Sequence, residues 1–231
     1  MRILIKISGE ALSHNTGKNY DFDYLQKIWK EIQQLQKTHQ IAIVCGGWNI
    51  CRWAEFSHNG ISPTVGHEVG MMATTMNALM LADIIEKLWT PTIVYTARDL
   101  SGIGEIFDSK RVKKSLDNGY ITFLSGGTGH PYFSTDTASV LRSLELSCEM
   151  MIKCTSVDGI YSADPKKDTK AQKFQTVTYD DILTKNLRIM DQASIALARD
   201  HDLRIGVCHI DILPSLSGLS GGIFEGSIIQ K

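Results

Sequence analysis

Several features that would place this chain in a specialised class are missing. It has no run of eighteen or more apolar residues, so we expect no membrane-spanning helix. Its first ten residues, MRILIKISGE, lack the long apolar stretch and cleavage site of a secretory signal. The net charge is −1, without the basic excess of a general nucleic-acid binder. We therefore expect a cytoplasmic protein that binds neither membranes nor nucleic acids.

The five cysteines are scattered, and none forms a C-x-x-C pair. Three of them lie in or beside apolar runs, where cysteine behaves as a small hydrophobic residue. These three are Cys45, Cys154 and Cys208. The histidines show no H-x-x-x-H spacing. We predict reduced, structural cysteines and no zinc site.

The common nucleotide-binding motifs are also missing. Neither the P-loop pattern G-x-x-x-x-G-K-[ST] nor the dinucleotide fingerprint G-x-G-x-x-G occurs. The protein-kinase motifs D-F-G and H-R-D are absent as well. These absences disfavour an ordinary ATPase, a dehydrogenase and a protein kinase.

Strand-like apolar runs alternate with helical patterns along nearly the whole chain. The runs lie at 2–7, 41–45, 92–96, 121–124, 149–154 and 204–210. This alternation predicts a mainly parallel sheet with helices on both faces. No linker-like stretch divides the chain, so we predict one domain over residues 1–231, a three-layer α/β/α sandwich.

The longest helical pattern covers residues 64–87. Its apolar positions recur at helical spacing, which predicts a face buried in the core. That face consists of Val69, Met72, Ala73, Met76, Leu79, Met80 and Ile84. We interpret the methionines as core filler.

The stretch at 124–136, LSGGTGHPYFSTD, points most directly to function. A strand-like run stops at three closely spaced glycines, and a helical pattern follows. Such a break leaves backbone N–H groups facing outward as a cradle for an anion. Two aromatic residues in the loop suggest a flat group beside the anion, as in a nucleotide. Glycine-bearing loops also follow the strands at 2–7 and 41–45, and ligands of open α/β sheets lie at strand carboxyl ends.

Lys6 and Arg52 are the cations placed to meet such an anion. Lys6 lies inside an apolar strand just before a glycine loop, where it either reaches a bound phosphate or extends to water from an edge strand. Arg52 follows the second glycine loop by five residues. It suits a bidentate phosphate clamp or an ordinary surface position.

Several acidic residues fit phosphoryl transfer, which needs carboxylates to hold magnesium and to position a lysine. They are Asp136, Asp158, Asp164 and Asp191. Each also suits a helix cap or a turn.

Six segments, in order, resemble the bacterial UMP kinases (uridylate kinases) of the amino-acid kinase family, from about residue 2 to residue 210. They are KISGEAL (6–12), VCGGWNICR (44–52), GMMATTMNAL (70–79), SGGTGHPYFSTDTA (125–138), VDGIYSADPK (157–166) and MDQASIALARD (190–200). The run T-G-x-P-[FY]-F-[ST]-T-D is the most specific part. Carbamate, acetylglutamate and aspartate kinases share the fold but lack this run.

The resemblance implies transfer of the γ-phosphoryl group of ATP to UMP, with Mg²⁺, in a homohexamer often activated by GTP and inhibited by UTP. It implies catalytic roles for Lys6, Arg52, Asp136 and Asp191. It implies ATP contacts by Lys6, Ile7, Ser8, Gly9, Trp48, Arg52, Thr155, Tyr161 and Asp164. It implies UMP contacts by Gly47, His67, Thr128, Gly129, His130, Pro131, Tyr132, Phe133, Ser134 and Thr135.

The chain departs from the family pattern at several of these positions. Trp48 stands where the family usually has a third glycine, and His67 where it has an aspartate on the UMP ribose. His67 suits the same ribose contact, or Glu68 takes it over. His130 replaces an asparagine, and GKNYDFD (17–23) replaces a glycine-rich segment of the GTP-responsive surface.

Three other functions remain open from the sequence. One is a related kinase that acts on a carboxylate or carbamate. Another is a nucleotide-binding regulator that kept the fold and lost turnover. A dinucleotide oxidoreductase is disfavoured by the missing fingerprint.

Overall fold

The structure is a computed structural model that describes residues 1–14, 18–51, 60–163, 165, 167–185, 187, 189–211 and 224–231. Arg52 and Asp164, two of the predicted site residues, lie outside the described residues.

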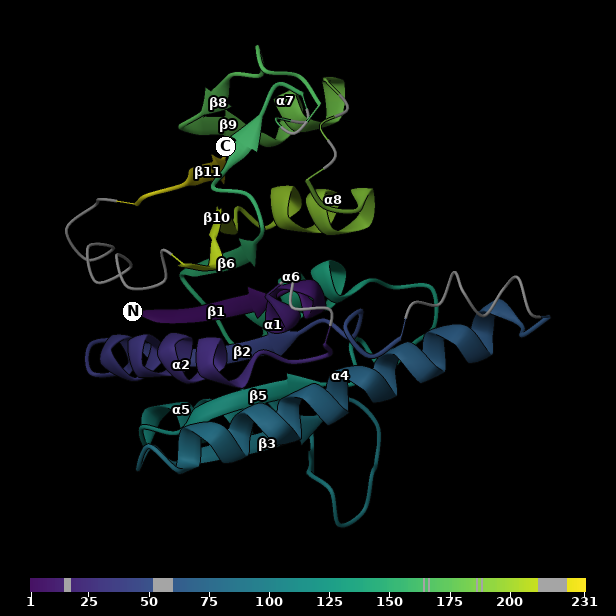
Figure 1. Ribbon diagram of the computed structural model, residues 1–231, viewed down its shortest axis with the longest axis vertical. Coiled ribbons are helices and arrows are strands. Elements are labelled where there is room, and N and C mark those ends of the chain that lie inside the picture. The colour runs from purple at the N-terminus through teal and green to yellow at the C-terminus, as the bar shows by residue number, and fades with distance from the viewer. Residues whose placement is uncertain are drawn as a thin grey trace.

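A nine-stranded sheet runs through the molecule in the order β4-β3-β5-β2-β1-β6-β10-β11-β9 (Figure 1). Its strands are β1 (Arg2–Ile7), β2 (Gln40–Cys45), β3 (Thr92–Thr96), β4 (Glu105–Ile106), β5 (Ile121–Ser125), β6 (Met150–Thr155), β9 (Thr176–Thr178), β10 (Arg204–His209) and β11 (Ser227–Gln230). Every pair is parallel except β10 with β11. The prediction of a mainly parallel sheet is therefore confirmed.

Strand β1 lies at the centre of the site-forming part of the sheet, between β2 and β6. Its five residues from Ile3 to Ile7 are buried, as expected for a parallel strand with helices on both faces. The register places Lys6 beside Val44 of β2 and Lys153 of β6. Two lysines thus stand side by side in buried strands.

Helices cover both faces of the sheet and give the predicted three layers. They are α1 (Gly9–Ser13), α2 (Phe22–Gln36), α4 (Pro63–Glu86), α5 (Ser109–Asp117), α6 (Thr135–Glu145), α7 (Tyr179–Thr184) and α8 (Gln192–Asp200). One core joins α1, α2 and α4 to the sheet, and the other joins α5 to α8 to the opposite face. No described helix has the length and apolar character that crossing a bilayer requires.

Polar caps fix where these helices begin. Asp21 accepts a hydrogen bond from Tyr24 N at the start of α2, and Asp108 accepts one from Arg111 N at the start of α5. Ser134 does the same for α6. These are the side chains that supply an acceptor to otherwise unpaired first-turn N–H groups.

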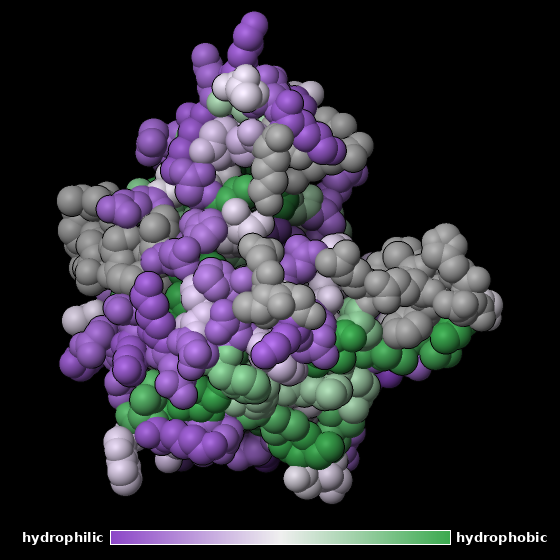
Figure 2. Space-filling model, in the orientation of Figure 1, coloured by the Kyte–Doolittle hydropathy of each residue, from purple (hydrophilic) through white to green (hydrophobic). Residues whose placement is uncertain are grey.

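The predicted buried face of the long helix is wrong in part. Ala73 is buried, and Met80 and Ile84 pack against the core, as predicted. However, Val69, Met72, Met76 and Leu79 are 37–54% exposed on α4. The residues that pack most closely on the sheet are mainly small, such as Ala73, Ala78 and Ala82. Small side chains let α4 approach the sheet closely. The bulkier side chains on the other face of the helix therefore point away from the sheet. Figure 2 shows hydrophobic residues gathered over α4 on the lower part of this face.

Four short strands were not predicted. They include β4 and β9 at the sheet edges, and the hairpin of β7 (Ile160–Tyr161) and β8 (Lys173–Phe174). Elements of two or three residues are too short to show a period-two pattern. The five cysteines, all among the described residues, form no disulfide, although Cys154 Sγ and Cys208 Sγ lie 4.0 Å apart.

Candidate active site

A cleft of about 390 Å³ opens where four neighbouring strands end. The loops after β5, β2, β1 and β6 meet there, at the carboxyl edge where α/β proteins hold their ligands. Its walls include Lys6, Ser8, Gly9, Glu10, Gly46, Gly47, Trp48, His67, Gly70, Met71, Thr74, Gly127, Tyr132, Phe133, Ser134, Thr135, Asp136, Lys153 and Thr155. The cleft therefore joins all three glycine loops that the sequence singled out.

Two lysines flank one carboxylate on the wall of this cleft. Asp136, in the first turn of α6, lies 3.0 Å from Lys6 Nζ and 2.6 Å from Lys153 Nζ. Lys153 Nζ also donates to the carbonyl of Ile189 at 2.7 Å. All three charged side chains are at most 14% exposed. The cluster carries one more positive charge than negative, which suits an incoming anion.

The buried cluster shifts the pKa values of its members. Burial raises the pKa of the Asp136 carboxyl, but the ammonium groups of Lys6 and Lys153 outweigh burial and hold it below its usual range. Burial lowers the pKa of the Lys153 ammonium, although Asp136 opposes this effect. The two ammonium groups thus favour the ionised form of Asp136, and a bound anion would favour the charged form of Lys153.

The first two glycine loops touch through their backbones. A Cβ on Gly9 would lie 2.5 Å from Trp48 N, closer than any side chain can come. Behind this contact, the buried Asn77 of α4 donates to Gly46 O at 2.6 Å and to Asn49 Oδ1 at 2.8 Å. The two loops are therefore held together by packing and by α4. Their close approach leaves backbone groups in the cleft wall, together with the exposed Trp48 side chain.

The third loop faces the first turns of α4 across the cleft. The rings of His67 and Tyr132 lie 5.0 Å apart, and Thr64 Oγ1 lies 3.2 Å from the Tyr132 hydroxyl. Tyr132 has a positive φ of 70°, an uncommon conformation for a residue with a side chain. Glu68 is paired with Arg98 at 3.3 Å and is not part of the cleft wall. Of the two residues proposed for a ribose contact, His67 is the one in the wall.

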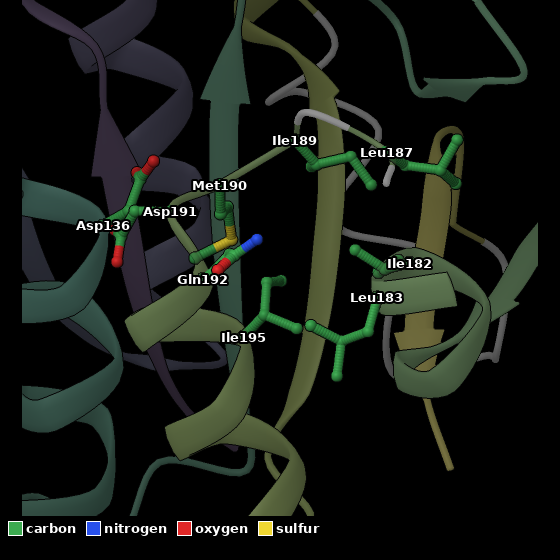
Figure 3. Close-up of a pocket in the computed structure, with 9 residues that line it drawn as sticks. All are labelled: Asp136, Ile182, Leu183, Leu187, Ile189, Met190, Asp191, Gln192 and Ile195. Atoms are coloured by element: carbon green, nitrogen blue, oxygen red, sulfur yellow. The ribbon is translucent and has the colours of Figure 1, made fainter. Parts of the chain in front are cut away.

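An apolar pocket of about 450 Å³ adjoins the cleft at Asp136. Figure 3 shows Asp136 and Asp191 at one end, with Met190 and Gln192 beside them. The other end is apolar and comes from α7, α8 and the segment between them. It comprises Ile182, Leu183, Leu187, Ile189 and Ile195. A flat hydrophobic group with a charged extension matches this arrangement.

The carboxylate of Asp191 is occupied by bonds within the protein. It accepts from Ser194 N as the cap of α8, from Ser134 Oγ at 2.5 Å and from Thr137 Oγ1 at 2.8 Å. Asp191 thus ties the start of α8 to the start of α6. Its charge lies near the Lys153 ammonium, although the two side chains form no direct bond.

The site offers a metal ion the buried carboxylate of Asp136 rather than a cage of ligands. Among the described residues, no group of three or more His, Cys, Asp or Glu is arranged to hold a metal. Asp136 Oδ1 is buried and, within the described residues, makes no hydrogen bond, although it pairs in charge with Lys6. A single carboxylate plus substrate phosphates and water is the usual Mg²⁺ environment in phosphoryl-transfer sites. The donor set therefore fits a magnesium ion brought in with a nucleotide.

Residues 1–209 match the family model described as "Amino acid kinase family". The chain belongs to the amino acid kinase family. Curated members include "Uridylate kinase" of Saccharophagus degradans, 39% identical and covering 99% of this chain and 93% of that protein. "Uridylate kinase" of Hydrogenovibrio crunogenus is 38% identical and covers 99% of this chain and 98% of its own.

Solved structures of family members superpose closely on this chain. The UMP kinase from Bacillus anthracis has a TM-score of 0.95 at 31% identity, covering 99% of this chain and 95% of that one. The UMP kinase from Ureaplasma parvum has a TM-score of 0.93 at 29% identity, covering 100% and 99%. The amino-acid kinase fold expected from the resemblance is confirmed.

The structure brings most, but not all, of the expected site residues to the cleft. The wall holds Lys6, Ser8, Gly9, Gly47, Trp48, His67, Tyr132, Phe133, Ser134, Thr135, Asp136 and Thr155. Outside the wall are Thr128, Gly129, His130, Pro131 and Asp191. The Ile7 side chain is buried in the core, which leaves only its backbone for a ligand, and the Tyr161 hydroxyl donates to Asp158.

Lys153 is the main site residue that the sequence interpretation missed. It lies in the apolar run EMMIKC, as Lys6 lies in RILIKI. The same signal, a lysine inside a buried strand, marks both residues. The difference between them is that Gly9 follows Lys6 by three residues, whereas the first glycine after Lys153 is Gly159.

Proposed function

We propose that this protein is a UMP kinase, a transferase that moves the γ-phosphoryl group of ATP to UMP and releases UDP and ADP. The observation that carries the proposal is the Lys6–Asp136–Lys153 cluster at the junction of a glycine-loop cleft and an apolar pocket. Full-length similarity to proteins named uridylate kinase supports the choice of acceptor. The reaction belongs to pyrimidine nucleotide biosynthesis in the cytoplasm, within one domain over residues 1–231.

The donor nucleotide occupies the side of the cleft next to β6. Ser8 and Gly9 offer backbone N–H groups to its phosphates, next to Lys6. The adenine enters the apolar pocket beside Met190. The phosphates lie at the charged end of this pocket, next to Asp136. Contacts to the adenosine come from Thr155, Tyr161 and Asp164 in this proposal, and Arg52 contacts the phosphates.

The acceptor nucleotide occupies the side of the cleft next to α4. Gly47 stands between the two substrates, and His67 contacts the UMP ribose. The loop at 128–135 surrounds the nucleotide, and Tyr132 and Phe133 present their rings to the cleft. This arrangement puts the UMP phosphate next to the lysine cluster.

Positioning and charge carry the chemistry. An oxygen of the UMP phosphate forms a bond to the γ-phosphorus while the bond from that phosphorus to the bridging oxygen breaks, leaving ADP. Lys6 and Lys153 stabilise the negative charge that spreads over the transferred oxygens. Asp136 orients both ammonium groups. No general base is needed, because the UMP phosphate is already anionic. Asp136 would hold a Mg²⁺ ion brought in with ATP, and such an ion would supply neutralisation of the phosphate charge.

The exposed apolar stripe of α4 supports the association of copies of this chain, which the proposed homohexamer requires. The stripe consists of Val65, Val69, Met72, Met76 and Leu79, spaced four, three, four and three residues apart. This is the spacing of a helix that packs on another helix. A contiguous exposed apolar patch of this kind marks an association surface. Control by GTP and UTP is part of the proposal.

A substrate panel tests the activity. The purified protein is given Mg-ATP with UMP, CMP, carbamate or acetylglutamate, and ADP release is followed together with UDP formation. We expect turnover with UMP, none with the carboxylate and carbamate substrates, and none with UMP in Lys6→Ala. Binding of UMP without UDP formation would instead indicate a regulator, and turnover with carbamate or acetylglutamate would indicate a different kinase.

A further inference from the structure

Two separate segments build the acceptor half of the cleft. One is the start of α4, which carries His67, and the other is the loop at 126–134. The two meet at the front of the cleft through the rings of His67 and Tyr132. The backbones of these segments are not hydrogen-bonded to each other as strands are. Their separation must therefore be set by side chains.

Arg98 joins these two segments from behind. It lies just after β3, and its Nε donates to Gly129 O at 2.7 Å. Its Nη1 donates to Glu68 Oε1 at 3.3 Å, and Glu68 directly follows His67. One planar guanidinium thus bonds to both sides of the acceptor half. Arg98 is not itself part of the cleft wall.

The loop at 126–134 packs against Ala97, the residue before Arg98. Gly129 has a φ of +83°, and a Cβ there would lie 3.3 Å from Ala97 O. Gly126 also packs on Ala97, and its N–H donates to Thr74 Oγ1 of α4 at 2.9 Å. The first end of the glycine turn is thus fixed to α4 by Thr74. The other end is joined to α4 through Arg98 and Glu68, and further along the loop the Tyr132 hydroxyl lies 3.2 Å from Thr64 Oγ1 of α4.

We propose that Arg98 is a positioning residue for the acceptor nucleotide. By bridging Glu68 and Gly129 it sets the gap between His67 and the loop that surrounds UMP. The inference rests on the proposed function, because it names what the gap holds. It assigns a role to a residue that the resemblance does not include.

The bridge matters for binding more than for stability. The Arg98–Glu68 ion pair is nearly half exposed at both ends, and such pairs contribute little to folding. Its value lies in geometry, because a guanidinium presents several N–H groups in one fixed plane. A lysine in its place would reach one partner but not hold both. The expected effect is therefore on UMP affinity, without a comparable effect on the chemical step.

Steady-state kinetics of Arg98→Ala test this role. We expect the KM for UMP to rise about three- to tenfold, the scale of one partly exposed hydrogen bond. We expect kcat and the KM for ATP to stay within about twofold, because only ground-state positioning of the acceptor is lost. Arg98→Lys should fall between Arg98→Ala and the unchanged protein. In the Arg98→Ala variant, a further Glu68→Ala change should raise the KM for UMP by a smaller factor than Glu68→Ala does in the unchanged protein.

Arg199→Ala is the matched control. Arg199 is also a partly exposed arginine paired with a carboxylate, Asp200, at 3.3 Å, but it lies on α8. The Arg199→Ala variant should have the same KM for UMP as the unchanged protein. If the unchanged protein makes UDP while Arg98→Ala keeps its KM for UMP, or raises the KM for ATP equally, the positioning role is wrong. If the unchanged protein makes no UDP from UMP, the proposed function fails first.

Discussion

At the scale of single residues, the buried lysines show what sequence can and cannot reveal. Lys6 was predicted because a glycine loop follows it directly. Lys153 carries the same mark of an ammonium in an apolar strand, but only the strand register places it beside Lys6. Asp136 stood among four acids that suited caps and turns equally well. The contacts at 3.0 and 2.6 Å single it out. Partners so distant in sequence are not visible until the strands are ordered.

Lys153→Met should reduce turnover strongly while the protein remains folded. It removes one of the two ammonium groups beside the transferred phosphoryl, and loss of one such donor costs about a hundredfold or more in kcat. Lys153→Arg should retain more activity because it keeps the charge. The measurement is kcat with UMP and Mg-ATP, with a thermal melt for each variant. Near-normal turnover in a folded Lys153→Met protein would remove this residue from the machinery.

His67→Ala should weaken UMP binding by about three- to tenfold, as expected for loss of one hydrogen bond. ATP binding should change little, because His67 lies on the acceptor side of the cleft. Titration calorimetry with each nucleotide measures both affinities. His201→Ala, at the exposed end of α8, is the matched histidine control. An unaltered UMP affinity in His67→Ala would take this residue out of the site.

His39 should make folding stability depend on pH. It is 4% exposed, and burial together with the nearby N-terminal ammonium lowers the pKa of its imidazole below 6.5. Below about pH 6.5 the unfolded chain takes up a proton that the folded protein resists, so the free energy of unfolding falls as pH falls. Urea unfolding at about pH 7.5 and about pH 5.5 measures this loss. His39→Phe should show a smaller loss, and an equal loss would contradict the assignment.

At the scale of elements, the pattern of α4 shows where periodicity stops being informative. A stripe at helical spacing predicts that one face is covered, but it does not say by what. On α2 the residues at helical spacing, including Leu25, Trp29 and Ile32, are buried in the core. On α4 the sheet instead takes the face of alanines, while Met72 and Met76 stay outside. Two usable faces on one helix cannot be ranked from sequence alone.

The cap of α8 should contribute more to the free energy of unfolding than an ordinary helix cap does. Asp191 bonds to Ser194 N and also to Ser134 and Thr137 of the neighbouring helix start. Asp191→Ala should lower the free energy of unfolding by about 2–4 kcal/mol, because one cap and two further hydrogen bonds are lost. Asp191→Asn should lose less. Urea denaturation measures each variant.

Asp108→Ala provides the comparison for that prediction. Asp108 caps α5 through Arg111 N and, within the part of the chain that the structure describes, makes no side-chain hydrogen bond to another helix. Its loss should cost only about 1 kcal/mol, the usual value of a cap. Equal losses for the two alanine variants would show that the tie between α6 and α8 contributes nothing.

At the scale of the whole molecule, strand alternation was sufficient to predict the three-layer fold but not the strand order. The order β5-β2-β1-β6 brings four loops to one edge, and that adjacency makes the site. A final strand over SIIQ follows from its apolar residues, but its antiparallel pairing with β10 and the short strands β4, β7, β8 and β9 came without a sequence signal. Such features depend on contacts formed after the sheet assembles, which local patterns do not encode.

The α4 stripe gives the last prediction, because it concerns the assembled protein. Met72 and Met76 are 44% and 54% exposed at neighbouring positions of the stripe. Replacing both by glutamate would place two charges in the centre of a packed helix pair, where they lose their hydration without partners. We expect light scattering after gel filtration to show a smaller species than the unchanged protein, with an unaltered circular dichroism spectrum.

Phe22→Glu separates this effect from a general loss of surface hydrophobicity. Phe22 is 55% exposed, close to the value for Met76, but it lies at the start of α2. That variant should keep the full assembly. Because α4 also carries His67 and the Asn77 that holds the second glycine loop, we expect the smaller species of the double variant to lose UMP turnover as well. If the double variant forms an assembly of the same mass as the unchanged protein, the stripe does not hold the subunits together.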